Sequence, residues 1–387
     1  MKFDVLVVGA GLAGAALAAA LRGSNLKVGI VEARPPARPA GWDARIYAIS
    51  PANVEFLDGI GIWQHLDPAR MAPVHDMEIH GDAGGRLDFS AYDSGLRELA
   101  CIVESSLMQH ELWETVKRQH NVTLVCPASP AALAIDDHAA RLTLTDGRRL
   151  EARLVVAADG RDSWVRQAAG IGARNTPYGE KGVVANFRCE KPHRNTAFQW
   201  FRNDGVLAYL PLPDQQMSMV WSAPDALADE LVALPPEALC ARVAEAGGHR
   251  LGQLELVTPA AAFALRLMRV EAVVRPRLAL IGDAAHAIHP LSGHGINLGY
   301  QDARVLAGQL AGLPAWRDPG ELAVLRGYAR ARAEETALLQ YTTHGLNRLF
   351  KPADPLLSGL RNLGLNLTNR LPVLRNALIR YAIAGRF

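Results

Sequence analysis

Residues 3–32 read FDVLVVGAGLAGAALAAALRGSNLKVGIVE. The β-branched run Phe3–Val8 stops at a glycine, and the alanine-rich segment Leu12–Arg22 is built from strong helix formers, so we expect a strand, a tight turn and a helix. A second apolar run, Leu26–Val31, ends in Glu32. These features predict one βαβ unit with parallel strands, which begins a doubly wound sheet.

The turn of this unit carries a GxGxxG fingerprint. Gly9, Gly11 and Gly14 allow the tight turn, the approach of the backbone to a pyrophosphate and close packing of the helix, and the helix N-terminus adds positive potential. Glu32 stands eighteen residues beyond Gly14, where a carboxylate can accept a hydrogen bond from a ribose hydroxyl. The pattern predicts an adenine dinucleotide, although it does not by itself distinguish NAD from FAD.

Two later apolar segments also end in an acid. Residues 154–160, LVVAADG, lead into Asp159-Gly160, and residues 280–286, LIGDAAH, lead into Asp283. Ligands of open α/β sheets bind at the carboxyl ends of the strands, so both carboxylates are expected at one ligand site. Asp283 is suited to the ribityl hydroxyls of a flavin, which makes FAD the expected cofactor.

The glycine-rich segment that follows Asp283 supplies the remaining candidates. Gly293–Leu298 offers backbone N–H groups at a helix start, which suit the electron-rich edge of a reduced flavin ring. No catalytic acid or base can be assigned from the sequence. The candidates for residues beside the reacting atoms are Pro290, His294 and Gly295.

Neither a metal nor a redox dithiol is expected. His286, His289 and His294 fall within nine residues, but no cysteine or carboxylate completes a zinc-ligand pattern around them. The four cysteines lie far apart and form no CxxC pair, which fits a reducing cytoplasm. A formal net charge of +2 gives no reason to expect nucleic acid as a partner.

The fold class expected is α/β: a Rossmann-like FAD-binding domain with a parallel sheet, an interleaved and mostly antiparallel substrate domain, and C-terminal helices. Strand-like segments between Asn175 and about Arg275 indicate the second sheet, and a helical pattern returns at Gln301–Leu310. The boundaries expected are 1–70, 98–174 and 276–340 for the FAD-binding domain, 71–97 and 175–275 for the substrate domain, and 341–387 for a basic helical tail.

In this order the motifs resemble the class A flavoprotein monooxygenases, and most closely the ubiquinone-biosynthesis hydroxylases among them. The resemblance covers nearly the whole chain. Besides the fingerprint and the two acidic motifs, it rests on DARIYAIS at 43–50, GHGINLG at 293–299 and LGL at 363–365. Two positions depart from the family pattern: Glu104 stands where relatives often carry Arg or Asn, and His294 where Gln is usual.

The resemblance implies a role for several further residues. Arg45 would approach the FAD pyrophosphate, Gln109 the ribityl chain and Val125 the adenine, while Asp159 and Asp283 would bind sugar portions of the cofactor. The complete set expected to bind FAD is Gly9, Gly11, Gly14, Glu32, Arg45, Gln109, Val125, Asp159, Gly160, Asp283, Gly293, Gly295, Ile296 and Asn297.

The same resemblance implies hydroxylation of an aromatic ring, with a polyprenylated phenol or quinol of ubiquinone biosynthesis as substrate. NADH or NADPH would donate electrons transiently, and a flavin hydroperoxide formed with O₂ would transfer one oxygen atom, which is the cofactor's own chemistry. Three different functions stay open: a hydroxylase of a soluble phenol, a flavin-dependent reductase of prenyl double bonds, and a lipid-binding relative without flavin.

The charge of the tail differs from that of the rest of the chain. Residues 345–387 hold seven basic residues and one acid out of totals of 41 and 39, so the tail carries +6 and the remainder −4. Leucines at 356, 357, 360, 363, 367 and 371 recur at roughly helical spacing, which would suit anionic lipid at the inner membrane surface or an acidic partner. We favour the simpler interpretation, a helix packed on the first domain with solvated arginines.

Overall fold

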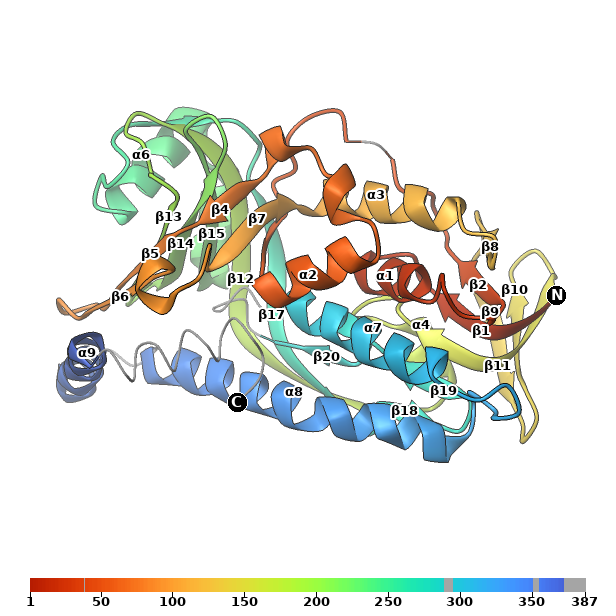
Figure 1. Cartoon of the computed structure of the whole chain (residues 1–387). Coiled ribbons are helices and arrows are strands. Elements are labelled where there is room, and N and C mark those ends of the chain that lie inside the picture. Colours follow the sequence, from red (N-terminus) through yellow and green to blue (C-terminus); the bar gives the residue numbers. More distant parts are fainter. Residues whose placement is uncertain (38, 289–294, 351–354, 372–387) are drawn as a thin grey trace.

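The computed structural model describes residues 1–37, 39–288, 295–350 and 355–371, which form three sheets flanked by helices (Figure 1). β1 (Lys2–Val8) lies inside the first sheet, parallel to β2 (Val28–Val31) on one side and to β11 (Arg149–Ala157) on the other. Val5, Leu6 and Val7 are fully buried. The predicted βαβ unit is therefore present, with α1 (Leu12–Ala20) as its helix.

The first sheet has eight strands. β8 (Val122–Val125) extends it beyond β2, and β19 (Leu278–Leu280) and then β18 (Val274–Arg275) extend it beyond β11. The predicted hairpin at Asp146-Gly147 is present, because β10 (Ala140–Leu144) pairs with β11 across this turn and with β9 (Pro130–Ile135) on its other side. The carboxyl ends of β1, β11 and β19 therefore meet at one edge, as the sequence predicts.

The second sheet has nine strands and is antiparallel except where β13 and β5 pair in parallel. Its strands, in spatial order, are β20 (His286–Ala287), β17 (Ala261–Val270), β12 (Ala173–Cys189), β15 (Gln216–Pro224), β14 (Gly205–Leu212), β13 (Thr196–Arg202), β5 (Asp76–His80) and β6 (Arg86–Ser90), with β16 (Leu254–Leu256) paired to β12. A small third sheet, in the order β3 (Ile46–Ile49), β7 (Ala100–Glu104) and β4 (Ala72–Val74), lies between the other two.

Helices cover the first sheet. α1 packs against α3 (Ser105–Lys117) and against α7 (Gly295–Ala311), which in turn contacts α2 (Pro51–Gly59) and α8 (Leu322–Phe350). α4 (Trp164–Ala168) follows β11, and α9 (Pro355–Arg370) lies at the far end of α8 beside β6 (Figure 1).

The structure departs from the expected elements in one segment. α5 (Asp225–Ala233) and α6 (Pro236–Ala246) lie where only strands were expected. They form because Leu231, Leu239 and Val243 pack against one face of the nine-stranded sheet. α7 starts at Gly295, within the segment 293–298 where a helix start was expected, and extends the helical pattern of Gln301–Leu310 at both ends; α8 runs without a break from Leu322 to Phe350.

Candidate active site

A cavity of about 820 Å³ joins the edge of the first sheet to the inner face of the second. One end is polar and is lined by Gly11, Arg45, Gln109, Asp159 and Asp283. The other end is formed by the second and third sheets and is mainly apolar, with lining residues that include Val74, Met77, Phe89, Leu210, Val220, Phe263 and Leu265. A deep cavity with one apolar and one polar end is typical of a site for an organic cofactor and substrate.

The three glycines of the fingerprint have different surroundings. Gly9 has φ +102°, and a Cβ there would collide with the carbonyl of Ala158, while a Cβ on Gly14 would collide with the carbonyl of Gly9. Both positions therefore require glycine for close packing. Gly11 is different, because no atom lies within 4 Å of the position that its Cβ would take. It lines the cavity at the start of α1, where the helix has no side-chain cap, and so leaves backbone N–H groups available to an anion.

Glu32 lies beyond the cavity lining, at the end of β2. Its Oε2 accepts a hydrogen bond from the backbone N–H of Ala10 at 2.7 Å, and its Oε1 accepts one from the backbone N–H of Arg34 at 3.0 Å. The carboxylate therefore holds the glycine turn, and its remaining lone pairs can accept ribose hydroxyls. Val125 is its neighbour on β8: the backbone N–H of Glu32 donates to the Val125 carbonyl at 3.1 Å. These two residues together mark the expected adenosine end.

Arg45 and Asp283 bring opposite charges to the polar end. Within the described part of the chain, the Arg45 guanidinium makes no hydrogen bond or ion pair, so it remains available to a phosphate. The Asp283 side chain is open to the cavity but is surrounded by protein. This enclosure raises the pKa of Asp283, although His286, Arg161 and Arg45 act in the opposite direction. Enclosure also raises the pKa of Tyr47, which lines the same cavity and remains a phenol.

Asp159 and Gly160 line the cavity as predicted, but the Asp159 side chain is already engaged. Its Oδ1 accepts from the Ser163 hydroxyl at 2.5 Å and its Oδ2 from the backbone N–H of Val165 at 2.9 Å. The carboxylate thus fixes the turn between β11 and α4. The buried Arg166 secures the same turn to the next motif by donating to the Ala284 carbonyl at 2.9 Å.

A buried ionic network lies directly behind the Asp283 motif. Asp302 of α7 accepts hydrogen bonds from His286 Nε2 at 2.6 Å, Arg332 Nε at 2.7 Å and the backbone N–H of Gly282 at 2.9 Å. Burial opposes protonation of His286, but Asp302 outweighs it and the pKa of His286 is raised. Burial likewise opposes ionisation of Asp302, yet His286 and Arg332 lower its pKa. The network ties β20 and the Asp283 turn to α7 and α8.

Asn297 lines the cavity in the first turn of α7, and its side chain is also engaged with the protein. Its Oδ1 accepts from the Ser50 backbone at 2.9 Å and from Asn53 at 2.8 Å, and its Nδ2 donates to the Ala48 carbonyl at 2.8 Å. The side chain therefore joins the first turn of α7 to β3 and α2. Gly295 and Ile296 line the cavity beside it.

The other residues singled out in the sequence lie in three different situations. Gln109 projects from α3 into the cavity lining. The candidates Pro290, Gly293 and His294, like His289, lie outside the described residues. The unusual Glu104 is fully buried and accepts two hydrogen bonds from Arg70, at 2.6 and 2.7 Å. The departure from the family pattern is thus accommodated by a salt bridge within the protein.

Sequence reasoning missed Asp302 and Arg332, which position the site without lining it. A signal for Asp302 was present, because it is the one acid in the 295–311 segment that forms α7 and lies on the buried face of that helix. Arg332 could not be paired with it from the sequence, since thirty residues separate the two.

The observed residues fit FAD. A glycine cradle at a helix N-terminus and the available Arg45 guanidinium suit a pyrophosphate. Asp283 can accept hydroxyl hydrogen bonds inside the cavity, and the N-terminal turn of α7 presents backbone N–H groups to a ring that gains negative charge. The apolar end leaves room for a second, hydrophobic molecule.

Comparison with known proteins agrees with this geometry. The family described as FAD binding domain matches residues 2–338. The chain is 35% identical over 383 residues to a ubiquinone hydroxylase of Rhodospirillum rubrum, covering 98% of this chain and 89% of that protein. It is also 35% identical over 386 residues to the 3-demethoxyubiquinol 3-hydroxylase of Escherichia coli, covering 98% of both.

Solved structures share the fold at lower identity. The p-nitrophenol 4-monooxygenase of Pseudomonas putida has a TM-score of 0.80 with 18% identity and covers 100% of this chain and 99% of its own. A probable FAD-dependent monooxygenase of Pseudomonas aeruginosa has a TM-score of 0.76 with 23% identity, and the match covers 94% of this chain and 99% of that protein. The chain belongs to the FAD binding domain family and, within it, to the FAD-dependent hydroxylases that include the ubiquinone hydroxylases.

Proposed function

We propose that this enzyme hydroxylates one ring carbon of a polyprenylated phenol or quinol in ubiquinone biosynthesis. The observation that carries the proposal is the continuous cavity, because it runs from the FAD-binding motifs to an apolar chamber between two sheets. The two relatives at 35% identity are named as ubiquinone-pathway hydroxylases, which supports the substrate class.

The nucleotide end of the cavity would hold the cofactor. Backbone N–H groups at Gly11 and the Arg45 guanidinium would neutralise the pyrophosphate, and Glu32 would accept ribose hydroxyls while it holds the glycine turn. Asp283 and Gln109 would bind the ribityl chain. When bound, FAD supplies the redox chemistry that activates O₂ with electrons from NADH or NADPH.

The protein's own contribution at the other end is positioning and exclusion of water. The N-terminal turn of α7 would stabilise negative charge on the flavin ring, and the salt-bridge network through Asp302 would keep that turn in place. Aliphatic and aromatic walls such as Leu210, Val220 and Phe263 would exclude water and orient the phenol ring toward the reacting oxygen.

The test in cells is the isoprenoid quinone profile, measured by mass spectrometry, of a strain that lacks this gene compared with the same strain carrying it. Accumulation of a precursor that lacks one ring hydroxyl, or the methoxy group derived from it, is expected and identifies the carbon. An unchanged profile in a strain without a redundant hydroxylase would contradict the quinone substrate and favour a soluble phenol.

A reductase and a flavin-free lipid-binding protein would behave differently in the test tube. A prenyl double-bond reductase would add two hydrogens to its substrate and would not consume O₂, whereas a hydroxylase must consume one O₂ for each ring hydroxyl that it forms. A lipid-binding protein without flavin would purify colourless. Parallel measurement of bound flavin, O₂ uptake and product mass separates these three functions.

A further inference from the structure

α9 docks on the protein through its polar face. The Oδ1 atoms of three asparagines accept backbone N–H groups of the β5–β6 turn and of β6: Asn362 from Gly85 at 2.7 Å, Asn366 from Arg86 at 2.9 Å and Asn369 from Asp88 at 3.0 Å. Among the described strands, β6 is the last of the nine-stranded sheet, so its outer N–H groups have no neighbouring strand to pair with. The asparagine row satisfies this edge.

An ion pair strengthens the same contact. Arg361 is almost completely buried and pairs with Asp82 in the β5–β6 turn, donating from Nε at 3.1 Å and also from a terminal nitrogen. Asp82 also accepts from Asn362 at 2.7 Å and from the Ser358 hydroxyl at 3.0 Å. The face of α9 that docks on the protein therefore carries these polar contacts beside a single packed leucine, Leu365.

As a consequence two leucines of α9 and the leucine that follows this helix are exposed. Leu363, Leu367 and Leu371 follow one another at four-residue spacing, roughly opposite the docked face, and are 63%, 56% and 45% exposed. The simpler interpretation of the tail, a helix packed on the first domain with solvated arginines, does not describe α9, which packs on β6 of the second sheet and buries Arg361. It fails because the edge strand requires hydrogen-bond acceptors, and these come from the polar face of the helix.

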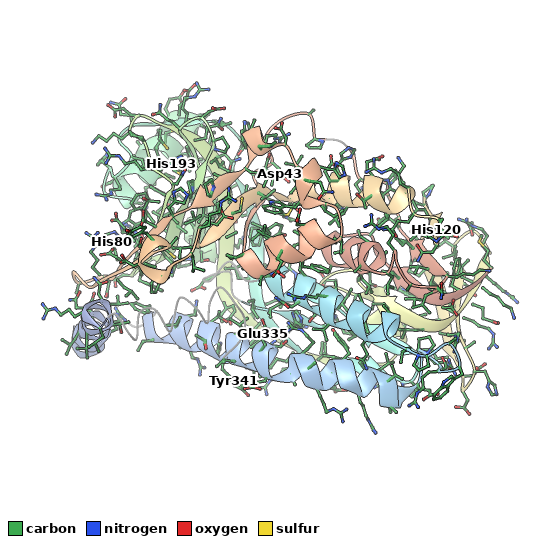
Figure 2. All side chains as sticks on the ribbon, viewed as in Figure 1. Asp43, His80, His120, His193, Glu335 and Tyr341 are labelled. Carbon is green, nitrogen blue, oxygen red and sulfur yellow. The ribbon has the colours of Figure 1, made fainter. Side chains whose placement is uncertain are left out.

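The neighbouring end of α8 is also apolar on its outside. Tyr341 is 63% exposed on the outer side of this helix (Figure 2), and Leu349 is 42% exposed. Together, Tyr341, Leu349, Leu363, Leu367 and Leu371 form what we call the outer leucine face. Large hydrophobic side chains exposed on two neighbouring helices indicate an interaction site.

The charge around this face is positive. Arg348, next to Leu349 on α8, and Arg370, at the end of α9, are both exposed. Leucines combined with arginines and without acids are typical of a segment that lies on anionic lipid. Within the described residues no helix has the length and apolar character needed to cross a bilayer, so the contact would be peripheral.

The outer leucine face is close to the substrate end of the cavity. Leu365, on the same helix, packs in one hydrophobic cluster with Met77, Phe89 and Val206. All three of those residues also line the cavity. α9 therefore packs against the same hydrophobic cluster as three residues of the cavity lining, although no described residue of α9 lines the cavity itself.

We propose that the outer leucine face docks on an anionic lipid bilayer and delivers the substrate end of the cavity to lipid that contains the polyprenylated substrate. The docking itself is independent of the reaction, while the delivery step rests on the proposed function. The apolar tail of the substrate would then pass from the bilayer to the cavity past the β5–β6 turn and α9.

The test is sedimentation of the FAD-loaded enzyme with vesicles, without substrate. The wild-type protein is expected to bind vesicles of phosphatidylcholine with phosphatidylglycerol and to bind phosphatidylcholine alone more weakly. The double variant Leu363→Gln/Leu367→Gln should lose about tenfold or more in affinity, and Arg370→Gln about fivefold on the anionic vesicles. The matched control is Val232→Gln/Trp316→Gln, which removes two exposed apolar side chains elsewhere and should bind as the wild type does.

The outcomes separate this proposal from the proposed function. Hydroxylation of a soluble short-chain phenol by the leucine variant at the wild-type rate, with loss of turnover on vesicle-embedded substrate, supports docking. If the leucine variant loses vesicle binding but the wild type hydroxylates no substrate, docking is supported and the proposed function is refuted. Failure of the wild type to bind either kind of vesicle would overturn docking. Docking would also be overturned if the wild type is a dimer that the leucine substitutions convert to a monomer, because the face would then bind another copy of the chain.

Discussion

At the scale of the residue, Asp283 carries the most specific prediction about the cofactor. Asp283→Ala removes the carboxylate that is open to the polar end of the cavity, so FAD affinity should fall by about ten- to hundredfold. The measurement is the ratio of flavin to protein after gel filtration. Asp58→Ala, on the exposed side of α2, is the control, and full retention of flavin by Asp283→Ala would refute the assignment.

Glu32 accepts a hydrogen bond from the backbone N–H of Ala10, and we expect it also to accept one from a ribose hydroxyl of FAD. Glu32→Ala should lower FAD affinity by about an order of magnitude, the scale of one charge-assisted hydrogen bond. Glu32→Gln keeps one acceptor oxygen and should lose less. Titration of the apoprotein with FAD checks both, and equal affinity of the alanine variant and the wild type would show that Glu32 does not contact the nucleotide.

The His286–Asp302 pair predicts a dependence of stability on pH. The pKa of His286 is raised above its ordinary 6.5, so the stability that this pair contributes is complete below 6.5 and is lost as pH rises through the raised pKa. Asp302→Asn should cost on the order of 3 kcal/mol, because it leaves the buried His286 without its counter-charge and Arg332 with Glu335 alone. In thermal unfolding, the difference in unfolding free energy between wild type and variant should shrink above neutral pH. A difference that is constant with pH would show that His286 is not protonated in the fold.

At the scale of the element, α9 is the clearest case of a helix positioned by its polar face. Its ion pair lowers the pKa of Asp82 to about 2, chiefly through the hydrogen bond from Arg361. A lowered carboxyl pKa stabilises the docked helix above the ordinary value of 3.8 and ceases to do so as pH falls toward about 2. Acid should therefore loosen α9.

The substitution Asp82→Asn should have the same effect at neutral pH. Hydrogen exchange of the backbone amides in α9 and in the β5–β6 turn is expected to rise, since the nearly buried Arg361 loses its counter-charge. Asp136→Asn breaks an exposed pair with Arg141 on another hairpin and should change little. Unchanged exchange in α9 after Asp82→Asn would mean that the asparagine row suffices to hold the helix.

Elements that depend on local periodicity were predictable from the sequence. β1, α1 and the β10–β11 hairpin follow from apolar runs and turn residues, and their agreement with the structure reflects strong local signals. α5 and α6 were not predicted, because two short helices inside a strand-rich segment give a weak signal. The side on which α9 packs could not be predicted, because the helical pattern defines two faces and the open edge of β6 decides which of them is buried.

At the scale of the whole molecule, the cavity joins residues from segments that are far apart in the chain. The sequence located most of its polar end, since Arg45, Gln109, Asp159 and Asp283 all line it. The apolar end could not be predicted, because residues such as Met77, Val220 and Phe263 resemble ordinary core residues until strand pairing brings them to one face. The network of Asp302 with Arg332 is equally a product of tertiary packing.

We expect this enzyme to transfer one oxygen atom of O₂ to an aromatic ring of a polyprenylated substrate. The most direct measurement incubates the FAD-loaded enzyme with a polyprenylated phenol, NADH or NADPH, and ¹⁸O₂, and determines the product by mass spectrometry. The expected product carries one ¹⁸O on the ring for each O₂ consumed in productive turnover. A product that gains two hydrogens and no ¹⁸O, or oxidation of the nicotinamide with the phenol unchanged, would contradict it.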